Sequence, residues 1–506
     1  MNYKLRHLVA ATLAGTALLG FGANAFADTT DDIVNALIAK GVLTEEEGQL
    51  LINSRELEKT ARAKVPAPKF KDGLVFENED KSTTFQIGGR IHADYRTFDH
   101  GNNENQTTGN TSNESDTFDI RRARLEFKGH FYDNFDFLLS ADAAGQTNGN
   151  TGAILDQAWL NISHYKPVQF RVGQFKVPMS MERKMSSNAL DFMERSQHDT
   201  ISTYEDRGAM IWGVPNDGVT YALAVVNGEG NKNRNDTDSR VSKPEFQANA
   251  TVNFAQLMDN KDAVYHLGFG ASTTDISKTG NLAGFPTPNN NTLWFAGGNQ
   301  ARTEARGVNY LALPSIGSAA NVSNEISRQR YNLEAAVAYG PVKVVAEYLK
   351  NDFRGDLTTA KSFDNSVKAY YASVLWNISG EKFADFYKEG IFTAVKPKNN
   401  FDFTKFTGGA WQLGARYSKF DASDFNNSTF VGATAANNVA RVATNTATST
   451  NTFEADAYTL GLNYVPNPNV RFMLNYIKTN FDTPILIEGA KEDSESAITA
   501  RAQFTF

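Results

Sequence analysis

The final segment of the chain, residues 497–506, alternates strictly between apolar and polar side chains. One parity carries Ile498, Ala500, Ala502, Phe504 and Phe506, and the other carries Thr499, Arg501, Gln503 and Thr505. Successive side chains of a β-strand point to opposite faces, so this segment has one face suited to lipid and one suited to water. Such a strand is typical of a transmembrane β-barrel.

The two ends of the chain both indicate export. Residues 1–27 have the layout of a secretory signal, with Lys4 and Arg6 before an apolar stretch and Ala25-Phe26-Ala27 as a cleavage site. The apolar stretch is shorter than the roughly 20 residues that a spanning helix needs, so we expect cleavage after Ala27 rather than an uncleaved anchor. The terminal Phe506 resembles the C-terminal signal with which Gram-negative bacteria assemble outer-membrane barrels.

Composition excludes several other classes of protein. No apolar run of about 18 residues follows the signal, which argues against a helical membrane bundle. The mean hydropathy of -0.42 suits a barrel in which every second residue faces water. The chain has no cysteine and a net charge of -7, which argue against thiolate metal sites and a nucleic-acid surface. Scattered histidines and the lack of catalytic motifs predict that it is not an enzyme, with no catalytic residues, metal or cofactor.

Three parts are expected: a signal peptide over 1–27, a helical or linker segment over 28–80, and an outer-membrane β-barrel over 81–506. In the second part, Thr44 followed by Glu47 has the spacing of a capping box. This segment is either a periplasmic extension that supports oligomers or contacts peptidoglycan, or a weakly structured tether. Pro66 and Pro68 separate it from the barrel.

The barrel region predicts an all-β fold of about 16 antiparallel strands with both ends in the periplasm. Short turns built from Asn, Asp, Gly and Pro alternate with long polar loops, which is the outer-membrane arrangement. In the first two strands Ile91 and Leu125 should face lipid, and Arg90 and Arg122 the lumen. The long connection 382–405 is assigned to the periplasmic side. A barrel of this size leaves an aqueous channel.

Three stretches together resemble the phosphate-selective porin O and P family of outer-membrane trimers. They are IGGR at 87–90, FDIRRARLEF at 118–127, and VGQFKVP at 172–178 with FMER at 192–195. The resemblance implies that the loop over 176–205 folds into the lumen and narrows it. It also implies an arginine ladder and a cationic constriction. Ladder positions are matched by Arg90, Arg121, Arg122 and Arg195.

The resemblance further places Arg183 at a constriction lysine of the family and Asp156 at its acidic partner. The second constriction lysine would lie at Asp136, where a carboxylate would repel an oxyanion. Arg302 and Arg306 resemble part of a further arginine cluster in the long loop 277–325. Arg183 is therefore the expected principal anion contact.

Guanidinium groups suit an anion path because each presents a flat fork of donors to two oxygens. Strand parity points Arg90, Arg122, Arg124 and Arg171 into the lumen, whereas Arg121 can join them only through a bulge or from above the membrane band. The alternative for each arginine is a structural ion pair with a carboxylate of the wall or loop.

We therefore expect an anion-selective porin for phosphate or similar small anions. The alternatives are a weakly selective porin for small polar solutes and a structural barrel linked to the cell wall. The expected partners are small anions, outer-membrane lipid, two further copies in a homotrimer and, through the N-terminal segment, peptidoglycan, but no nucleic acid. The expected anion-binding and pore-lining residues are Arg90, Arg121, Arg122, Arg124, Asp156, Arg183 and Arg195.

Overall fold

The computed structural model describes most of the barrel region and a few N-terminal residues. The described residues are 38–41, 44–47, 49–50, 68–70, 73–99, 116–144, 154–228, 243–277, 300–313, 325–358, 361–426, 452–487 and 490–506. The chain separates into two compact units, residues 1–68 with 77–81 and residues 69–76 with 82–506. The expected signal peptide over 1–27 lies outside the described residues.

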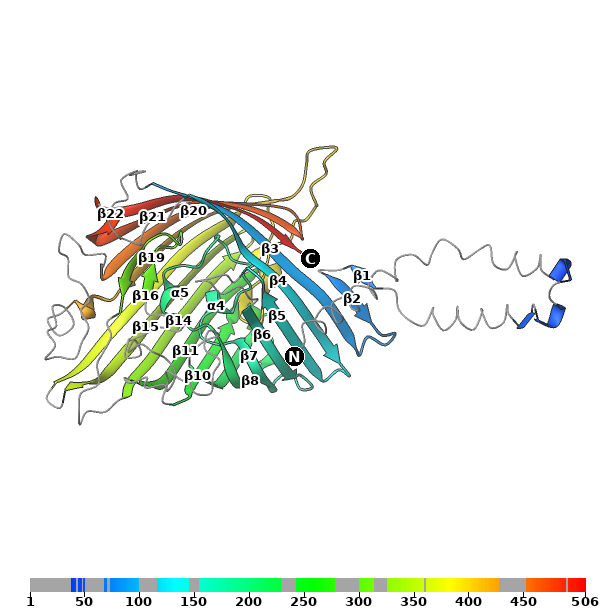
Figure 1. Ribbon diagram of the computed structural model, residues 1–506, viewed down its shortest axis with the longest axis horizontal. Helices are drawn as coiled ribbons and strands as arrows, with labels where there is room; N and C mark the ends of the chain where they lie inside the picture. The colour runs from blue at the N-terminus through cyan, green and yellow to red at the C-terminus, as the bar shows by residue number, and fades with distance from the viewer. Residues whose placement is uncertain are drawn as a thin grey trace, which may run out of the picture. The chain divides into compact units, whose positions relative to one another are not determined.

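The second unit is a closed antiparallel barrel (Figure 1). Its sixteen strands are β3 (Thr84–Phe98), β4 (Thr117–Phe131), β5 (Phe135–Asp142), β6 (Ile154–Ile162), β7 (Gln169–Lys176), β8 (Glu205–Asn216), β9 (Val219–Val226), β10 (Glu245–Asn253), β11 (Ala263–Ser277), β14 (Glu325–Tyr339), β15 (Val342–Thr358), β16 (Lys361–Asn377), β19 (Ala410–Asp421), β20 (Glu454–Asn467), β21 (Val470–Ile487) and β22 (Ala490–Thr505). Each pairs with the next, and β22 pairs with β3 to close the ring. The predicted fold and strand number are confirmed.

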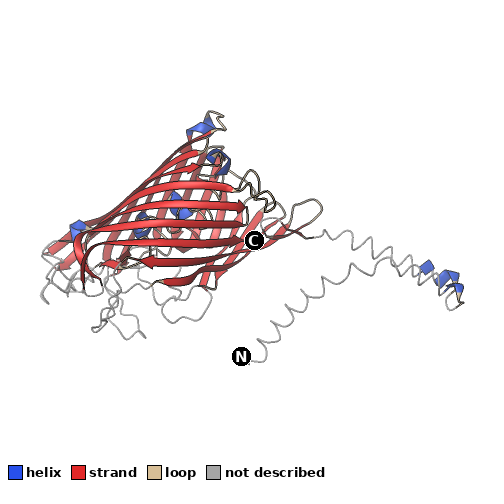
Figure 2. Cartoon of the chain, turned by 90° about the horizontal axis from the view of Figure 1, so that it is seen from above, coloured by secondary structure: helices blue, strands red, loops and turns tan. Residues whose placement is uncertain are grey.

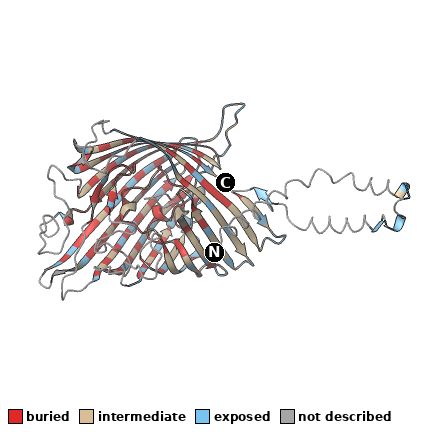
Figure 3. Cartoon of the chain, viewed as in Figure 1, coloured by how far each residue is buried: buried red, intermediate tan, exposed pale blue. Residues whose placement is uncertain are grey.

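Buried and exposed residues alternate along the strands, as Figure 3 shows. In β3, Ile91 is 44% exposed while its neighbours Arg90 and His92 are buried. In β4, Leu125 is 43% exposed while Arg122 is buried. The exposed parity is apolar because it faces lipid, and the buried parity is polar because it faces the lumen. The predicted orientation of these four side chains is therefore confirmed.

The closing contact explains a glycine near the start of the barrel. The Gly89 N–H donates to the Phe506 carbonyl at 2.8 Å, and the Phe506 N–H donates back at 3.1 Å. A Cβ on Gly89 would lie 2.6 Å from the Phe506 ring, so only glycine lets the terminal ring lie against this strand. The last residue thus takes part in closing the barrel.

Most connections at the end that carries the C-terminus are short, at the predicted turn sequences. An example is Gly340-Pro341 between β14 and β15. The exception at this end is residues 378–409, between β16 and β19, which include η2 (Phe383–Phe386), β17 (Tyr387–Lys388) and β18 (Ile391–Phe392). The predicted long periplasmic connection thus lies on the expected side.

Several shorter elements complete the fold. Strands β1 (Lys69–Phe70) and β2 (Leu74–Glu77) pair with each other, and β2 also pairs with β3, so the barrel sheet extends into the expected linker. Strands β12 (Gln300–Arg302) and β13 (Asn309–Ala312) form a hairpin within the connection between β11 and β14. The remaining helices are α4 (Met181–Lys184), α5 (His198–Ile201), α6 (Phe254–Leu257) and η3 (Ser423–Phe425). Among the described helices, none is both long and apolar enough to cross a bilayer.

In the first unit, the expected capping box is present. The Glu47 N–H donates to Thr44 Oγ1 at 3.2 Å, and the Thr44 N–H donates to Glu47 Oε2 at 3.0 Å. These reciprocal hydrogen bonds satisfy two backbone donors at the start of a helix. They also lower the pKa of the Glu47 carboxyl, because they stabilise its charged form.

Candidate functional site

The connection between β7 and β8, residues 177–204, enters the barrel and is called here the lumen loop. Figure 1 labels its helices α4 and α5 among the strands of the barrel, and Figure 2 shows short helices behind the near strands. Ser180 caps α4 by accepting a hydrogen bond from the Arg183 N–H at 3.2 Å. On the opposite wall, Glu347 accepts hydrogen bonds from the Met181 and Glu182 N–H groups at 3.0 and 2.7 Å. A wall carboxylate therefore holds the start of the helix in the lumen.

The far arm of the lumen loop is held by ionic contacts around Glu194. This carboxylate pairs with Arg121 at 2.8 Å, Arg501 at 3.1 Å and Arg96 at 3.2 Å. Burial alone would raise the pKa of Glu194, but the nearby charges, first of Arg121 and then of Arg501, hold it well below its usual range. Arg501 also binds Asp94 with two nitrogens, at 2.6 and 2.7 Å. This cluster ties the loop to the seam where the barrel closes.

The wall formed by β3 to β6 carries three of the predicted site residues, and each of them is in an ion pair. Arg124 binds Asp142 at 2.7 Å and Asp156 at 2.6 Å. Arg90 pairs with Glu126 and donates to Ser187 of the lumen loop at 2.9 Å. Asp156 was expected to be the partner of Arg183, but the structure pairs it with Arg124 of β4.

Arg121 and Arg122 are adjacent in sequence and both reach the lumen. The register between β3 and β4 shifts there, since His92 pairs with Arg122 and Ala93 pairs with Ile120. Arg121 is therefore the extra residue of a β-bulge, which turns it to the polar side of the sheet. The predicted bulge is confirmed.

Arg122 is buried but has few hydrogen-bond and ion-pair partners. Its residue is 4% exposed, and its guanidinium meets His92 Nδ1 at 3.4 Å. The other ring nitrogen of His92 lies 3.0 Å from the Asn188 amide oxygen, so we assign the proton to Nε2 and leave Nδ1 to accept from Arg122. Among the residues that the structure describes, no carboxylate lies within ion-pair distance of Arg122, and its Nε has no hydrogen-bond partner.

Arg183 and Arg195 lie on the lumen loop, where they are tied to the loop itself. Arg183 pairs with Glu205 at 2.7 Å and Asp199 at 3.3 Å, and its guanidinium lies 4.0 Å from the centre of the Tyr204 ring. Arg195 donates to the carbonyls of Glu182 at 3.1 Å and Met185 at 3.2 Å. The ion-pair partners of Arg183 among the described residues are therefore Asp199 and Glu205, and not Asp156.

Asp136 lies near the turn that joins β4 to β5, at the periplasmic end of the wall. Its carboxylate oxygens lie 2.6 Å from His130 Nδ1 and 3.2 Å from Asn161 Nδ2. These contacts place the carboxylate beside the strand end. It is therefore at a different height from Arg90, Arg122 and Arg124, whose strand positions lie further into the barrel.

The described part of the connection between β11 and β14 also enters the lumen. Glu304 pairs with Arg416 at 2.6 Å and accepts from the Gln197 N–H of the lumen loop at 3.1 Å. The side chain of Arg302 donates to the carbonyls of Arg306 and Gly307. Repulsion by Arg121, followed by burial, lowers the pKa of Arg306 to about 9.

Sequence reasoning missed two cations of this region. Lys176 ends β7 and donates to the carbonyls of Met185 at 2.6 Å and Lys184 at 3.2 Å. Arg501 had already been assigned to the polar face of the last strand, and that parity was the signal that could have placed it in the site. The signal for Lys176 was its place in the VGQFKVP stretch at the start of the loop expected in the lumen, whereas its backbone partners depend on how that loop folds.

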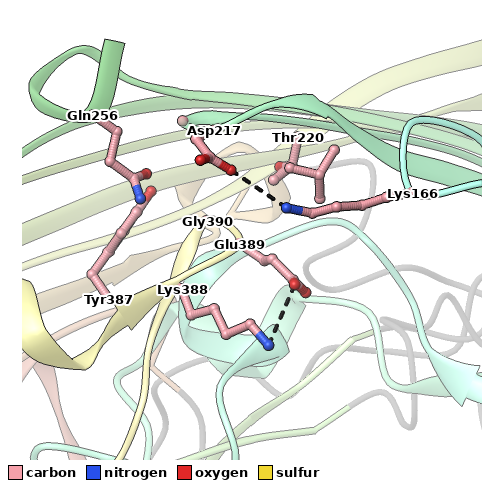
Figure 4. A pocket seen from close by; sticks show the side chains of 10 residues that line it. Lys166, Asp217, Thr220, Gln256, Tyr387, Lys388, Glu389 and Gly390 are labelled. Atoms are coloured by element: carbon pink, nitrogen blue, oxygen red, sulfur yellow. Dashed lines mark hydrogen bonds and ion pairs between the residues drawn. The ribbon is translucent and has the colours of Figure 1, made fainter. Parts of the chain in front are cut away.

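A cavity of about 160 Å³ lies near the periplasmic end of the lumen (Figure 4). Two ion pairs line it, Lys166–Asp217 at 3.4 Å and Lys388–Glu389 at 3.5 Å. Tyr387 also lines it, and its hydroxyl lies 2.7 Å from His266 Nδ1. The connection 378–409 therefore contributes side chains to the lumen as well as joining two strands.

Comparison with known proteins agrees with the geometry. The family model of the phosphate-selective porin O and P proteins matches residues 85–506. The chain is 27% identical to Porin O of Pseudomonas aeruginosa over 445 residues, which cover 87% of this chain and 92% of the relative.

Two solved outer-membrane proteins are also similar. OmpT of Vibrio cholerae has a TM-score of 0.45 at 9% identity, with 84% of this chain and 98% of that chain covered. The outer membrane channel DcaP of Acinetobacter baumannii has a TM-score of 0.45 at 10% identity, with 85% and 99% covered.

Proposed function

Because this chain belongs to the phosphate-selective porin O and P family and is an outer-membrane porin, we propose that its lumen selects small anions through Arg122 and the cations around it. These comparisons point to a channel and not to an enzyme. The proposed solutes are inorganic phosphate and anions of similar size and charge.

The observation that carries the proposal is the state of Arg122. Most cations of the lumen have a carboxylate partner, as Arg124 has in Asp142 and Asp156. Arg122 has none within ion-pair distance among the described residues. The charges that act on it are three arginines, Arg121, Arg501 and Arg124, and one carboxylate, Glu194, which is already paired with Arg121 and Arg501. A guanidinium with free donors beside other cations favours an anion as its missing partner.

The neighbours of Arg122 support passage rather than permanent binding. Arg90 and Arg124 lie on the same wall, and each shares its charge with at least one carboxylate. Paired cations hold an anion more weakly than a free one does. A path needs sites that admit an ion and then release it.

Ion selectivity in planar bilayers tests the proposal directly. Under a potassium chloride gradient, the reversal potential should show that chloride permeates better than potassium, despite the net charge of -7. Many acidic side chains lie outside the lumen and are screened within about 10 Å at 0.1 M salt. Cation selectivity would instead show that Asp136, Asp156 and the other lumen carboxylates outweigh the arginines.

Arg122→Gln isolates the residue that carries the proposal. The variant loses a charge-assisted contact with the anion, about 1.5–3 kcal/mol, which corresponds to a weakening of roughly 10- to 150-fold. The reversal potential should move toward zero and the block of chloride current by phosphate should weaken. Arg354→Gln is the matched control, because its exposed pair with Asp364 lies toward the extracellular end of β15 and β16.

Arg171→Gln should have a smaller effect than Arg122→Gln. The Arg171 guanidinium lies 4.1 Å from the centre of the Trp159 ring and 4.9 Å from that of Trp212, so both faces of its planar group are already occupied.

The same recordings separate the alternative functions. If chloride current flows but phosphate does not block it, the protein is a general porin for small anions. A sealed lumen would favour the structural barrel.

We also propose a homotrimer, which the resemblance to the family's trimers supports. A contact of the N-terminal segment with peptidoglycan stays a hypothesis. It predicts that the chain sediments with purified cell walls and that deletion of residues 28–64 abolishes this.

A further inference from the structure

The loop over residues 399–409, within the connection between β16 and β19, carries two exposed phenylalanines. Phe403 and Phe406 are each 78% exposed. Both rings meet Phe401 edge to face, with centroid distances of 5.0 and 6.2 Å. Exposed apolar side chains that gather in one place mark an interaction surface.

The backbone of this loop is hydrogen-bonded in a way that holds the two rings outward. The Asp402 N–H donates to the Thr407 carbonyl and the Phe406 N–H donates to the Asp402 carbonyl, both at 2.8 Å. The Asp402 carboxylate accepts from the Thr404 N–H at 2.8 Å and the Lys405 N–H at 3.2 Å. Phe406 has a φ of 54°, a conformation that is unfavourable for a bulky side chain. The exposure of the rings is therefore a property of a fixed turn.

The loop is continuous with the lipid-facing surface of the barrel. Phe401 contacts Tyr464 edge to face at 6.1 Å, and Tyr464 stacks on Trp411 at 4.3 Å. Trp411 and Tyr464 lie at the periplasmic ends of β19 and β20, where barrels carry an aromatic girdle. In Figure 1 the gold segment near residue 400 stands out from the barrel at the end that carries the C-terminus.

The position and chemistry of the loop fit phospholipid. We propose that residues 399–409 are a lipid anchor that inserts Phe403 and Phe406 into the inner leaflet of the outer membrane. The aromatic rings lie at the boundary between headgroups and acyl chains, as other interfacial aromatic residues do. Lys405 stands between the two rings in sequence, and its side chain is 77% exposed. Its ammonium lies 3.9 Å from the Asp402 carboxylate, a long surface pair that leaves it able to reach a lipid phosphate.

The absence of cysteine allows a single spin label to report on the surroundings of the loop. Thr404→Cys keeps both rings and places a nitroxide between them. Leu460→Cys on the lipid-facing side of β20 is the lipid reference, and Lys261→Cys on the turn between β10 and β11 is the water reference. Each labelled protein is reconstituted into vesicles of phosphatidylethanolamine and phosphatidylglycerol.

Collision rates with oxygen, which concentrates in lipid, and with a water-soluble nickel chelate locate the label. The measured quantity is the ratio of the collision rate with oxygen to that with the nickel chelate. For the label at position 404, this ratio should be several-fold above that of the Lys261 label and nearer to that of the Leu460 label. The ratio should fall to the Lys261 value when Phe403→Ser and Phe406→Ser are added, because the loop then loses its apolar side chains. Heat-modifiable gel mobility verifies that each variant has folded.

Two results would overturn the proposal. If the label at position 404 collides mainly with the nickel chelate when both phenylalanines are present, the loop lies in water. A label shielded from both reagents, with spin–spin broadening that disappears on dilution with unlabelled protein, would mean that a second copy of the chain covers the loop.

Discussion

Arginines that match one family pattern in the sequence differ in what their guanidinium groups contact. Arg183 and Arg122 were both expected to meet the anion. Arg183 has two carboxylates and a tyrosine ring around it, whereas Arg122 meets a histidine nitrogen and neighbouring cations. At the scale of single residues, these partners separate a group that holds the loop from one that is available to an ion.

Arg183→Gln should therefore act first on stability. It breaks the ion pair of Glu205 and leaves Asp199 with Arg195 at 3.7 Å, and breaking a buried pair costs about 3–5 kcal/mol. The urea concentration at which half of the folded band on gels is lost should therefore fall. Arg354→Gln at an exposed pair should change the free energy of unfolding by only about 0–1 kcal/mol and leave this midpoint nearly unchanged. An unchanged midpoint with a shifted reversal potential would instead make Arg183 a direct anion contact, as the sequence predicts.

Glu182 gives the lumen loop a pH dependence. Burial raises the pKa of its carboxyl to about 7, and Arg416 opposes the shift only in part. Between the ordinary value of 4.5 and about 7, the folded state binds more protons than the unfolded state, so stability falls as the pH rises. Urea midpoints measured from pH 4.5 to 8 should fall in that window, and Glu182→Gln should reduce the slope. A slope that persists in the variant would assign the effect to another group.

At the scale of elements, the lumen loop and the connection 378–409 meet at one lysine of β15. Lys343 pairs with Asp191 of the lumen loop at 2.8 Å. Its ammonium also lies 4.8 and 4.3 Å from the ring centres of Phe383 and Phe392 in the connection. One buried charge thus holds two long connections against the same wall.

Lys343→Met should loosen both connections together. The variant keeps an apolar stem but loses the ion pair and the two cation–π contacts, each worth up to about 2 kcal/mol when desolvated. Open-channel current noise should rise and proteases should cut within residues 378–409 more readily. Lys350→Met on the same strand, whose lysine pairs with Asp352 at 2.8 Å, should leave both readouts unchanged. Equal noise in the two variants would show that Lys343 does not couple the elements.

At the scale of the whole molecule, the seam between β22 and β3 closes the barrel wall. Unboiled samples should migrate on gels as a compact oligomer that heating converts to a slower monomer, because a closed barrel binds little detergent. Cross-linking should stop at three copies. A helical circular-dichroism spectrum, or a monomer in mild detergent, would contradict the expected trimer.

The same seam gives a test of closure. Gly89→Val would place a side chain against the Phe506 ring and against the Arg124 carbonyl, which a Cβ on Gly89 would already approach to 2.4 Å. The fraction of chain in the heat-modifiable folded form should fall in refolding assays. Gly355→Val is a control for the loss of a strand glycine, since a Cβ there meets only side-chain atoms, of Ile326 and Phe363 at 3.1 Å. Equal folding of both variants would argue against a special role for Gly89.

The sequence alone determined the features that depend on neighbouring residues. Alternation placed Arg90, Arg122 and Arg124 on the lumen face, turn residues placed the hairpins, and the parity of Arg121 allowed it there only through a bulge or from above the membrane band. These inferences succeed because side-chain direction in a strand has a period of two, and turn geometry depends on a few consecutive residues.

Only the tertiary structure decided which side chains from distant parts of the chain became partners. Arg90 meets Ser187, Arg416 meets Glu304, and Phe401 meets Tyr464, although each pair lies more than 60 residues apart in the chain. Such contacts arise where loops cross the lumen or fold back on the wall, and strand periodicity does not specify where a loop crosses. The sequence therefore gives the polarity of the lumen, and loop packing decides which of its arginines keeps free donors.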